Sequence, residues 1–134
     1  MLVKTSDLIG PALDWAVAKC EGYRDANDPT GQHDDPDEVL CAHNWMLMRG
    51  EGVSAVWLIN MDYSSNWSKG GPIIEREKLY ISQTDDLIAS IWKTGLGGDA
   101  FGSYQQGPTP LISAMRCFVA SKLGDEVDTP EELL

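Results

Sequence analysis

The sequence predicts an α+β fold, in which a small antiparallel β-sheet of about three to four strands packs with an N-terminal and a C-terminal amphipathic helix and an acidic helix in between. Helical patterns lie near both ends of the chain, and runs of apolar, β-branched and aromatic residues typical of strands lie in the middle. The length of 134 residues indicates a single globular domain, 1–134.

Residues 10–22, GPALDWAVAKCEG, predict the first helix. Pro11 suits the first helical position, where its missing N–H group costs nothing, and Gly22 suits the left-handed residue after the helix. Apolar residues recur at three- and four-residue spacing and form one face, whereas Asp14 and Glu21 fall on the opposite face. We therefore expect Asp14 to be a surface acid rather than a general base.

Less regular segments flank this helix. Residues 3–9 predict a short strand followed by a turn at 5–7, and residues 23–35 predict an exposed loop because turn-forming residues and acids dominate them. The next segment, 36–49, predicts the acidic helix. It begins in the stretch DPDE, which suits a helix N-terminus, and Gly50 ends it.

Three segments predict the strands of the sheet: 54–63, 72–82 and 86–94. Only a short polar turn separates the last two, so we expect them to pair as a hairpin. Residues 95–108, GLGGDAFGSYQQGP, carry five glycines, and this composition predicts an exposed loop.

The closing helix is predicted over 110–123, with Thr109 as its cap and Gly124 as its end. Its apolar face comprises Leu111, Ile112, Met115, Phe118, Val119 and Leu123, and its opposite face comprises Ser113, Cys117 and Ala120. Arg116 lies at the border between the two faces.

Acidic residues outnumber basic ones, and the formal net charge is −11. This charge opposes approach to DNA or RNA phosphates, so no direct nucleic-acid binding is expected, whereas a basic protein surface would be attracted. The closing residues, 125–134, predict an exposed acidic tail in which Val127 can dock. No apolar run reaches the roughly 18 to 20 residues of a membrane span. The N-terminus also lacks a signal-peptide pattern, so we expect a cytoplasmic protein with no membrane partner.

Three blocks of the sequence carry a family resemblance: ALDWAVAKCEG at 12–22, YSSNWSKGGPIIERE at 63–77, and GPTPLISAMRCFVASKLGDEV at 107–127, followed by PEELL. Their combination and order resemble the NinX family of small proteins from lambdoid phages and prophages. The resemblance implies a phage accessory protein that acts in the bacterial cytoplasm, and it implies no particular reaction. Residues 23–53 and 82–104 depart from the family's pattern.

Two of these blocks contain Gly/Pro segments whose chemistry simple packing does not require: NWSKGGPIIER at 66–76 and QGPTP at 106–110. The candidate ligand-binding residues are Trp67, Lys69, Gly70, Gly71, Arg76, Trp92, Thr109 and Arg116. If the two turns converge, backbone N–H groups, the Thr109 hydroxyl and a cation would hold a phosphate, while Trp67 or Trp92 stacks on a base. The alternative is that the first segment is only a turn and the second only a helix cap.

Metal and catalytic sites are not predicted. His33, Cys41 and His43 lie near four acids, but Cys41 and His43 would point to different faces of a helix, which prevents a shared tetrahedral site. The three cysteines form no CxxC pair and indicate reduced thiols. No motif links a nucleophile to a base, and no phosphate-binding glycine motif is present, so no catalytic residue and no cofactor are assigned.

Five tryptophans are more than one small core usually needs: Trp15, Trp45, Trp57, Trp67 and Trp92. The first three are expected in the core, and the others are available for a pocket or for a homo-oligomer interface. Their abundance therefore indicates a contact surface or a binding site beside the core.

Two functions from different classes follow from these features. The leading hypothesis is a non-enzymatic phage accessory protein that binds a small anionic, nucleotide-like ligand, with sequestration of a host defence signal as its use. The alternative is an acidic protein–protein interaction module that blocks a host protein by binding a basic surface of that host protein. Hydrolysis of a nucleotide is a third and weaker hypothesis.

Overall fold

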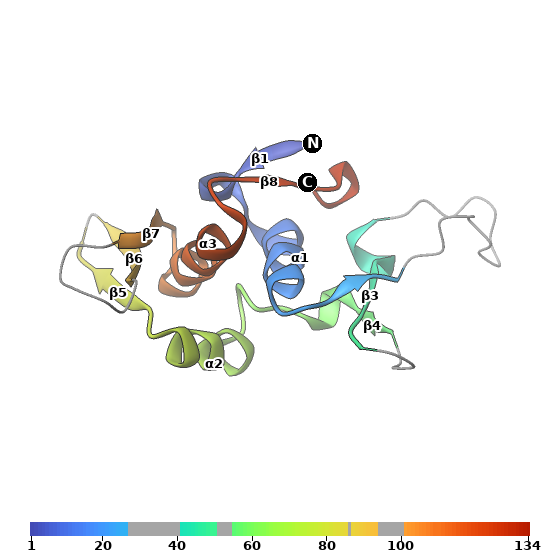
Figure 1. Ribbon diagram of the computed structural model, residues 1–134, viewed down its shortest axis with the longest axis horizontal. Coiled ribbons are helices and arrows are strands. Elements are labelled where there is room, and N and C mark those ends of the chain that lie inside the picture. The colour runs from blue at the N-terminus through green and yellow to red at the C-terminus, as the bar shows by residue number, and fades with distance from the viewer. Residues whose placement is uncertain (27–40, 51–54, 86, 94–100) are drawn as a thin grey trace.

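A computed structural model of the chain describes residues 1–26, 41–50, 55–85, 87–93 and 101–134 (Figure 1). Within these residues lie three α-helices and three small antiparallel sheets, so the fold is α+β as predicted. The predicted single sheet is instead divided into sheets of two, three and three strands. Among the described residues, no helix is long and apolar enough to cross a membrane.

Helix α3, Pro110–Leu123, lies near the centre of the molecule. It packs between α1, Gly10–Cys20, and the three-stranded sheet at the left of the view (Figure 1). Its predicted boundaries are confirmed, and the Thr109 hydroxyl accepts a hydrogen bond from the Ile112 amide at 3.1 Å. The predicted amphipathic pattern of α3 is wrong, because Ser113, Cys117 and Ala120 are buried with the apolar face. Neighbouring elements surround the middle of α3, so no face there is left to solvent.

Helix α2, Trp67–Glu77, replaces the first half of the strand predicted over 72–82. Asn66 caps it by accepting a hydrogen bond from the Ser68 amide at 3.0 Å, and Lys78 ends it in the left-handed conformation with φ of 54°. Gly70 and Gly71 are therefore helical rather than part of a turn. The prediction failed because glycines followed by proline are typical of turns, whereas here a well-capped helix start outweighs their low helix propensity.

The sheet beside α3 has the order β5–β6–β7, formed by Tyr80–Gln83, Ile88–Lys93 and Phe101–Gln106. The predicted hairpin between the first two strands is confirmed by their antiparallel register. The loop predicted over 95–108 is wrong for 101–106, since these residues pair along β6. Pairing with β6 and cover from α3 stabilise this strand despite its glycine; the remaining residues of the predicted loop up to 100 lie outside the described residues.

The two ends of the chain lie side by side (Figure 1), where β1, Leu2–Lys4, pairs with β8, Glu126–Asp128. The predicted strand and turn near the N-terminus are confirmed, since a 3-10 helix covers Thr5–Asp7. The acidic tail is packed rather than simply exposed: Val127, Thr129 and Leu133 are buried while its carboxylates face solvent. Its alternation of apolar and acidic residues allows a strand with one buried face.

The third sheet has the order β2–β3–β4, formed by Arg24–Asp25, Met46–Met48 and Val56–Trp57. The acidic helix predicted over 36–49 is therefore wrong from residue 41 onward, because Cys41 is extended and a 3-10 helix, Ala42–Asn44, leads into β3. Its residues 36–40 lie outside the described residues. The strand predicted over 54–63 is shortened to β4 and followed by a 3-10 helix, Leu58–Asn60.

Alternate burial explains β3. Leu47 is completely buried between two half-buried methionines, and the preceding Trp45 is also buried. The Trp45 indole donates to Asp25 Oδ1 at 3.0 Å, and this bond between distant residues fixes the strand against β2. A helix over the same residues would not place these two groups in contact.

Candidate functional site

Arg116 is the buried cation of the central helix, and only 8% of its surface is exposed. Its Nε atom donates to the Leu8 carbonyl oxygen at 2.7 Å, and its Nη1 atom donates to the Gln106 carbonyl oxygen at 2.9 Å. The side chain thereby joins α3 to the segment before α1 and to the end of β7. A guanidinium carries five N–H groups, so these two bonds leave it further donors.

The charge of Arg116 is incompletely compensated. Burial lowers its pKa from the ordinary value, and the nearby Asp7 carboxylate opposes that decrease. The partners of the guanidinium within the described part of the chain are the neutral carbonyl groups of Leu8 and Gln106. A buried cation held by neutral acceptors favours an anion that can reach it.

A cavity of about 560 Å³ opens beside this guanidinium. Its walls come from the 3-10 helix before α1, the start of β6, the end of β7, the segment that joins β7 to α3, and α3 itself. The lining residues are Ser6, Asp7, Leu87, Ile88, Tyr104, Gln105, Gln106, Gly107, Pro108 and Arg116. We call this space the Arg116 cavity. Its size falls in the range of small-molecule sites, which combine apolar walls with a few polar groups.

Gly107 allows the chain to pass close to α3 at this cavity. A Cβ atom on this residue would lie 2.7 Å from the Ser113 amide nitrogen and 3.0 Å from the Ser113 Cα atom. The QGPTP segment therefore needs a glycine for close backbone approach, and the next residue, Pro108, forms part of the cavity wall.

A second cavity of about 440 Å³ shares part of this wall. Leu87, Ile88, Gly107 and Pro108 line both spaces, and the second is extended by Gln83, Thr84 and Asp85 of the β5–β6 turn. A ligand longer than the Arg116 cavity would therefore continue toward the Asp85 carboxylate.

The two predicted Gly/Pro segments do meet, but as the starts of two helices. A Cβ atom on Gly70 would lie 2.6 Å from both Leu111 Cδ1 and the Tyr63 carbonyl oxygen, so α2 packs against the first turn of α3 at van der Waals distance. A cavity of about 290 Å³ lies here, and its lining includes Trp67 and Thr109. At each of these two helix starts a backbone amide already donates to the side chain of the capping residue, Asn66 in α2 and Thr109 in α3.

Lys69 and Gly71 are not among the residues that line the Arg116 cavity. The Lys69 ammonium group forms an ion pair with the Asp62 carboxylate at 3.4 Å. A Cβ atom added to Gly71 would lie 3.9 Å from the Trp67 ring. The side chain of Trp92, on β6, falls outside the described residues. The predicted set is therefore divided, and Arg116 is its member at the larger cavity.

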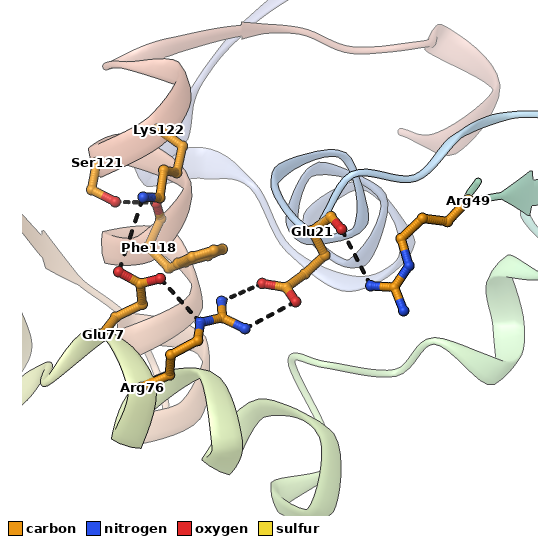
Figure 2. A network of polar contacts seen from close by, with 7 residues as sticks. All are labelled: Glu21, Arg49, Arg76, Glu77, Phe118, Ser121 and Lys122. Atoms are coloured by element: carbon orange, nitrogen blue, oxygen red, sulfur yellow. Dashed lines mark hydrogen bonds and ion pairs between the residues drawn. The ribbon is translucent and has the colours of Figure 1, made fainter.

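Arg76 belongs to a network that joins the three helices (Figure 2). Its guanidinium binds the carboxylate of Glu21, the residue that follows α1, with two N–H groups and donates to Glu77 at 3.2 Å. Lys122 of α3 lies 4.0 Å from Glu77. The cations of Arg76 and Lys122 lie 5.7 Å and 6.0 Å from the centre of the Phe118 ring. The network covers this buried ring, which indicates a structural role.

Two carboxylates that accept structural hydrogen bonds were not predicted, a buried one at Asp14 and a solvent-exposed one at Asp25. Asp14 is buried rather than at the surface, because it accepts a hydrogen bond from the Ser64 amide at 2.8 Å and so holds the segment before α2 on α1. Burial raises the pKa of Asp14 to about 6. Asp25 Oδ1 accepts the indole N–H groups of Trp15 and Trp45, at 2.9 Å and 3.0 Å.

Sequence reasoning missed Tyr104 and Gln106 because it assigned them to a loop. Once β7 is recognised, the period of two places these residues on the same face, and Gln106 Nε2 donates to Tyr104 Oη at 3.2 Å. In the described ranges, no group of three or more His, Cys, Asp and Glu side chains could hold a metal ion.

Comparisons with known proteins gave one family assignment. A family model described as Bacteriophage P22, NinX matches residues 4–122 of the chain. The match includes the Arg116 cavity and all three helices apart from the last residue of α3. No curated protein matches the chain.

Proposed function

Since this chain belongs to the NinX family of bacteriophage P22, we propose that it is a phage accessory protein that binds a small anionic, nucleotide-like ligand in the bacterial host cytoplasm without turning it over. The observation that carries this proposal is the buried Arg116 guanidinium in the wall of the Arg116 cavity. By holding a host defence signal, such a protein would blunt antiviral defence.

The position of the cation supports an anionic ligand. Leu8 and Gln106 carbonyl groups hold the guanidinium in one orientation, so a ligand would meet a preorganised donor. Burial weakens the competition from water, and charge-assisted hydrogen bonds to a phosphate or carboxylate are stronger than neutral ones.

The remaining lining supports a flat, polar ring beside the anion. Tyr104 offers an aromatic surface that is 47% exposed, and Leu87 and Pro108 add apolar contacts. The side chains of Gln105 and Gln106 contribute carboxamides, which both donate and accept hydrogen bonds. A nucleobase presents the same combination of an aromatic face and a polar edge.

The lining chemistry supports binding without catalysis. The described lining residues include one serine and one carboxylate, Ser6 and Asp7, and no histidine or cysteine. A hydroxyl nucleophile ordinarily needs an adjacent base to become reactive. Sequestration of a ligand requires only hydrogen-bond donors, a positive charge and an aromatic ring, which the lining provides.

Calorimetric titration of the purified protein tests this function. Adenosine 5′-monophosphate, adenosine 3′,5′-cyclic monophosphate, cyclic dinucleotides and inorganic phosphate serve as probes. We expect heat of binding with at least one nucleotide, and a loss of about tenfold or more in affinity for Tyr104→Leu and Arg116→Lys. Circular dichroism verifies that each variant is folded. Absence of heat with every probe would remove the ligand-binding function.

The acidic tail supports a second candidate, an interaction module that blocks a host protein. Its carboxylates at 125, 126, 128, 131 and 132 face solvent, while buried neighbours hold the backbone in place. A rigid display of acids fits a basic host surface. Capture from infected cells with wild type and with a Glu131→Lys/Glu132→Lys variant tests it: a host protein retained by both would contradict an electrostatic interface.

A further inference from the structure

The Arg116 cavity has a specific balance of charge. Its described lining holds one cation, Arg116, and one carboxylate, Asp7, and its other lining side chains are neutral. The cavity therefore carries no net charge of its own, in a chain whose formal net charge is −11. Each further negative charge on a ligand would meet repulsion without a second cation to offset it.

Asp7 is held close to the guanidinium by the fold. It ends the 3-10 helix Thr5–Asp7, and the next residue, Leu8, supplies the carbonyl that fixes Arg116. Thr5 anchors the same short helix, because its amide and hydroxyl donate to the carbonyl groups of Asp125 and Gly124 at 2.8 Å and 2.6 Å. Asp7 and Arg116 line the same cavity, and the Asp7 carboxylate opposes the decrease in the Arg116 pKa that burial causes.

A second carboxylate limits ligands that extend beyond the cavity. Asp85 lines the neighbouring space, which shares Leu87, Gly107 and Pro108 with the Arg116 cavity. A chain of phosphates leaving Arg116 in this direction would approach a negative group. No lysine or arginine is among the described residues that line this neighbouring space.

Building on the proposed function, we propose that the Arg116 cavity selects ligands with a single negative charge, and that Asp7 is the residue that excludes more highly charged anions. The ligand class is then a phosphodiester, which carries one charge, rather than a phosphate monoester or a polyphosphate. The place of Asp7 at the end of the 3-10 helix, in the lining of the same cavity as the cation, makes it a specificity-determining residue.

Three adenine nucleotides with the same base separate charge from shape. At pH 7.5 without divalent cations, adenosine 3′,5′-cyclic monophosphate carries one charge, adenosine 5′-monophosphate about two, and adenosine 5′-triphosphate about four. We expect affinities measured by calorimetry to fall in that order for the wild type. Their dependence on sodium chloride reports the accompanying electrostatic repulsion.

The Asp7→Asn variant tests the role of the carboxylate. It should tighten binding by about fivefold for each negative charge on the ligand, so the monophosphate gains more than the cyclic nucleotide. Glu75→Gln is the matched control, since it removes the same charge from an exposed position on α2, outside the lining of the Arg116 cavity. We expect little change in affinity for this control.

The outcomes separate this inference from the proposed function. Triphosphate binding as tightly as the cyclic nucleotide would overturn charge selection and leave the ligand-binding function standing. Equal effects of Asp7→Asn and Glu75→Gln would overturn the role of Asp7. Absence of heat with all three nucleotides would overturn the proposed function and, with it, this inference.

Discussion

The Nε atom of Arg116 donates to the carbonyl oxygen of Leu8 at 2.7 Å, a hydrogen bond between residues separated by 108 positions. This bond fixes the segment before α1 against the central helix and places Asp7 at the Arg116 cavity. The same contact therefore has two consequences: it stabilises the fold, and it sets the electrostatics of the site.

Replacing Arg116 should reveal the structural consequence. Arg116→Met leaves two carbonyl groups without their donor, and we expect a loss of about 2 to 4 kcal/mol in the free energy of unfolding. Lys122→Met removes the same charge from an exposed position on the same helix and should cost about 1 kcal/mol or less. Urea denaturation measures both. Equal losses would contradict a specific role for the Arg116 hydrogen bonds.

The two glycines of α2 should respond differently to alanine. Gly70→Ala places a Cβ atom 2.6 Å from both a Leu111 methyl carbon and the Tyr63 carbonyl oxygen, so α2 must shift. We expect a loss of about 1 to 3 kcal/mol despite the better helix propensity of alanine. At Gly71 the nearest atom is 3.9 Å away, and Gly71→Ala should change stability by less than about 1 kcal/mol. Thermal unfolding distinguishes the two variants.

Asp14 should make the stability depend on pH. Its pKa is about 6 in the folded protein, above its ordinary value of 3.8, so the folded state binds the proton more tightly than the unfolded state. The Asp14 contribution to stability is therefore greatest below about pH 4, and about 3 kcal/mol of it is lost as the pH rises from about 4 through about 6. Asp14→Asn keeps an acceptor for Ser64 and removes this titration.

Urea denaturation of wild type and Asp14→Asn between pH 4 and pH 8 tests that prediction. The variant should gain stability relative to wild type as the pH rises. Parallel pH profiles for the two proteins would show that Asp14 does not titrate in this range. The two proteins differ only at this residue, so the difference between their pH profiles reports the Asp14 carboxyl.

Asp25 should act in the opposite direction. Burial alone raises its pKa, but hydrogen bonds from Trp15, Trp45 and Lys19 outweigh burial, and the pKa is lowered. Its stabilising contribution is present above the ordinary pKa of 3.8 and is lost as the pH falls through the lower folded-state value. Asp25→Leu leaves two indole N–H groups without an acceptor and should cost about 2 to 4 kcal/mol at pH 7. Tryptophan fluorescence during urea denaturation provides the measurement, and an unchanged midpoint would contradict it.

Local signals in the sequence predicted α1 and α3, because proline at the first turn, a capping threonine and helical periodicity all act within a few residues. The same rules failed at α2, where Asn66 provides a cap that the following Gly-Gly-Pro obscured. They also failed at β7, whose stability depends on pairing with β6 and on cover by α3. Such contacts depend on the tertiary structure, and the secondary-structure propensities of single residues carry no information about them.

The candidate site shows the same division. Arg116 and the QGPTP segment were identified from the residues themselves, because a cation and a glycine before a capped helix carry recognisable chemistry. The actual partners of Arg116, Leu8 and Gln106, are backbone carbonyl groups, which any residue type provides. No residue pattern therefore marked them, and the cavity became visible only in three dimensions.

The most direct test of ligand binding at the Arg116 cavity is a titration followed by nuclear magnetic resonance. Adenosine 3′,5′-cyclic monophosphate is added to ¹⁵N-labelled protein, and the Arg116 Nε–H signal and the backbone amides are monitored. We predict saturable shifts of Arg116, Tyr104 and Gly107, with Ser68 at the start of α2 unaffected. Unchanged Arg116 and Gly107 signals at saturating nucleotide would contradict binding at this cavity.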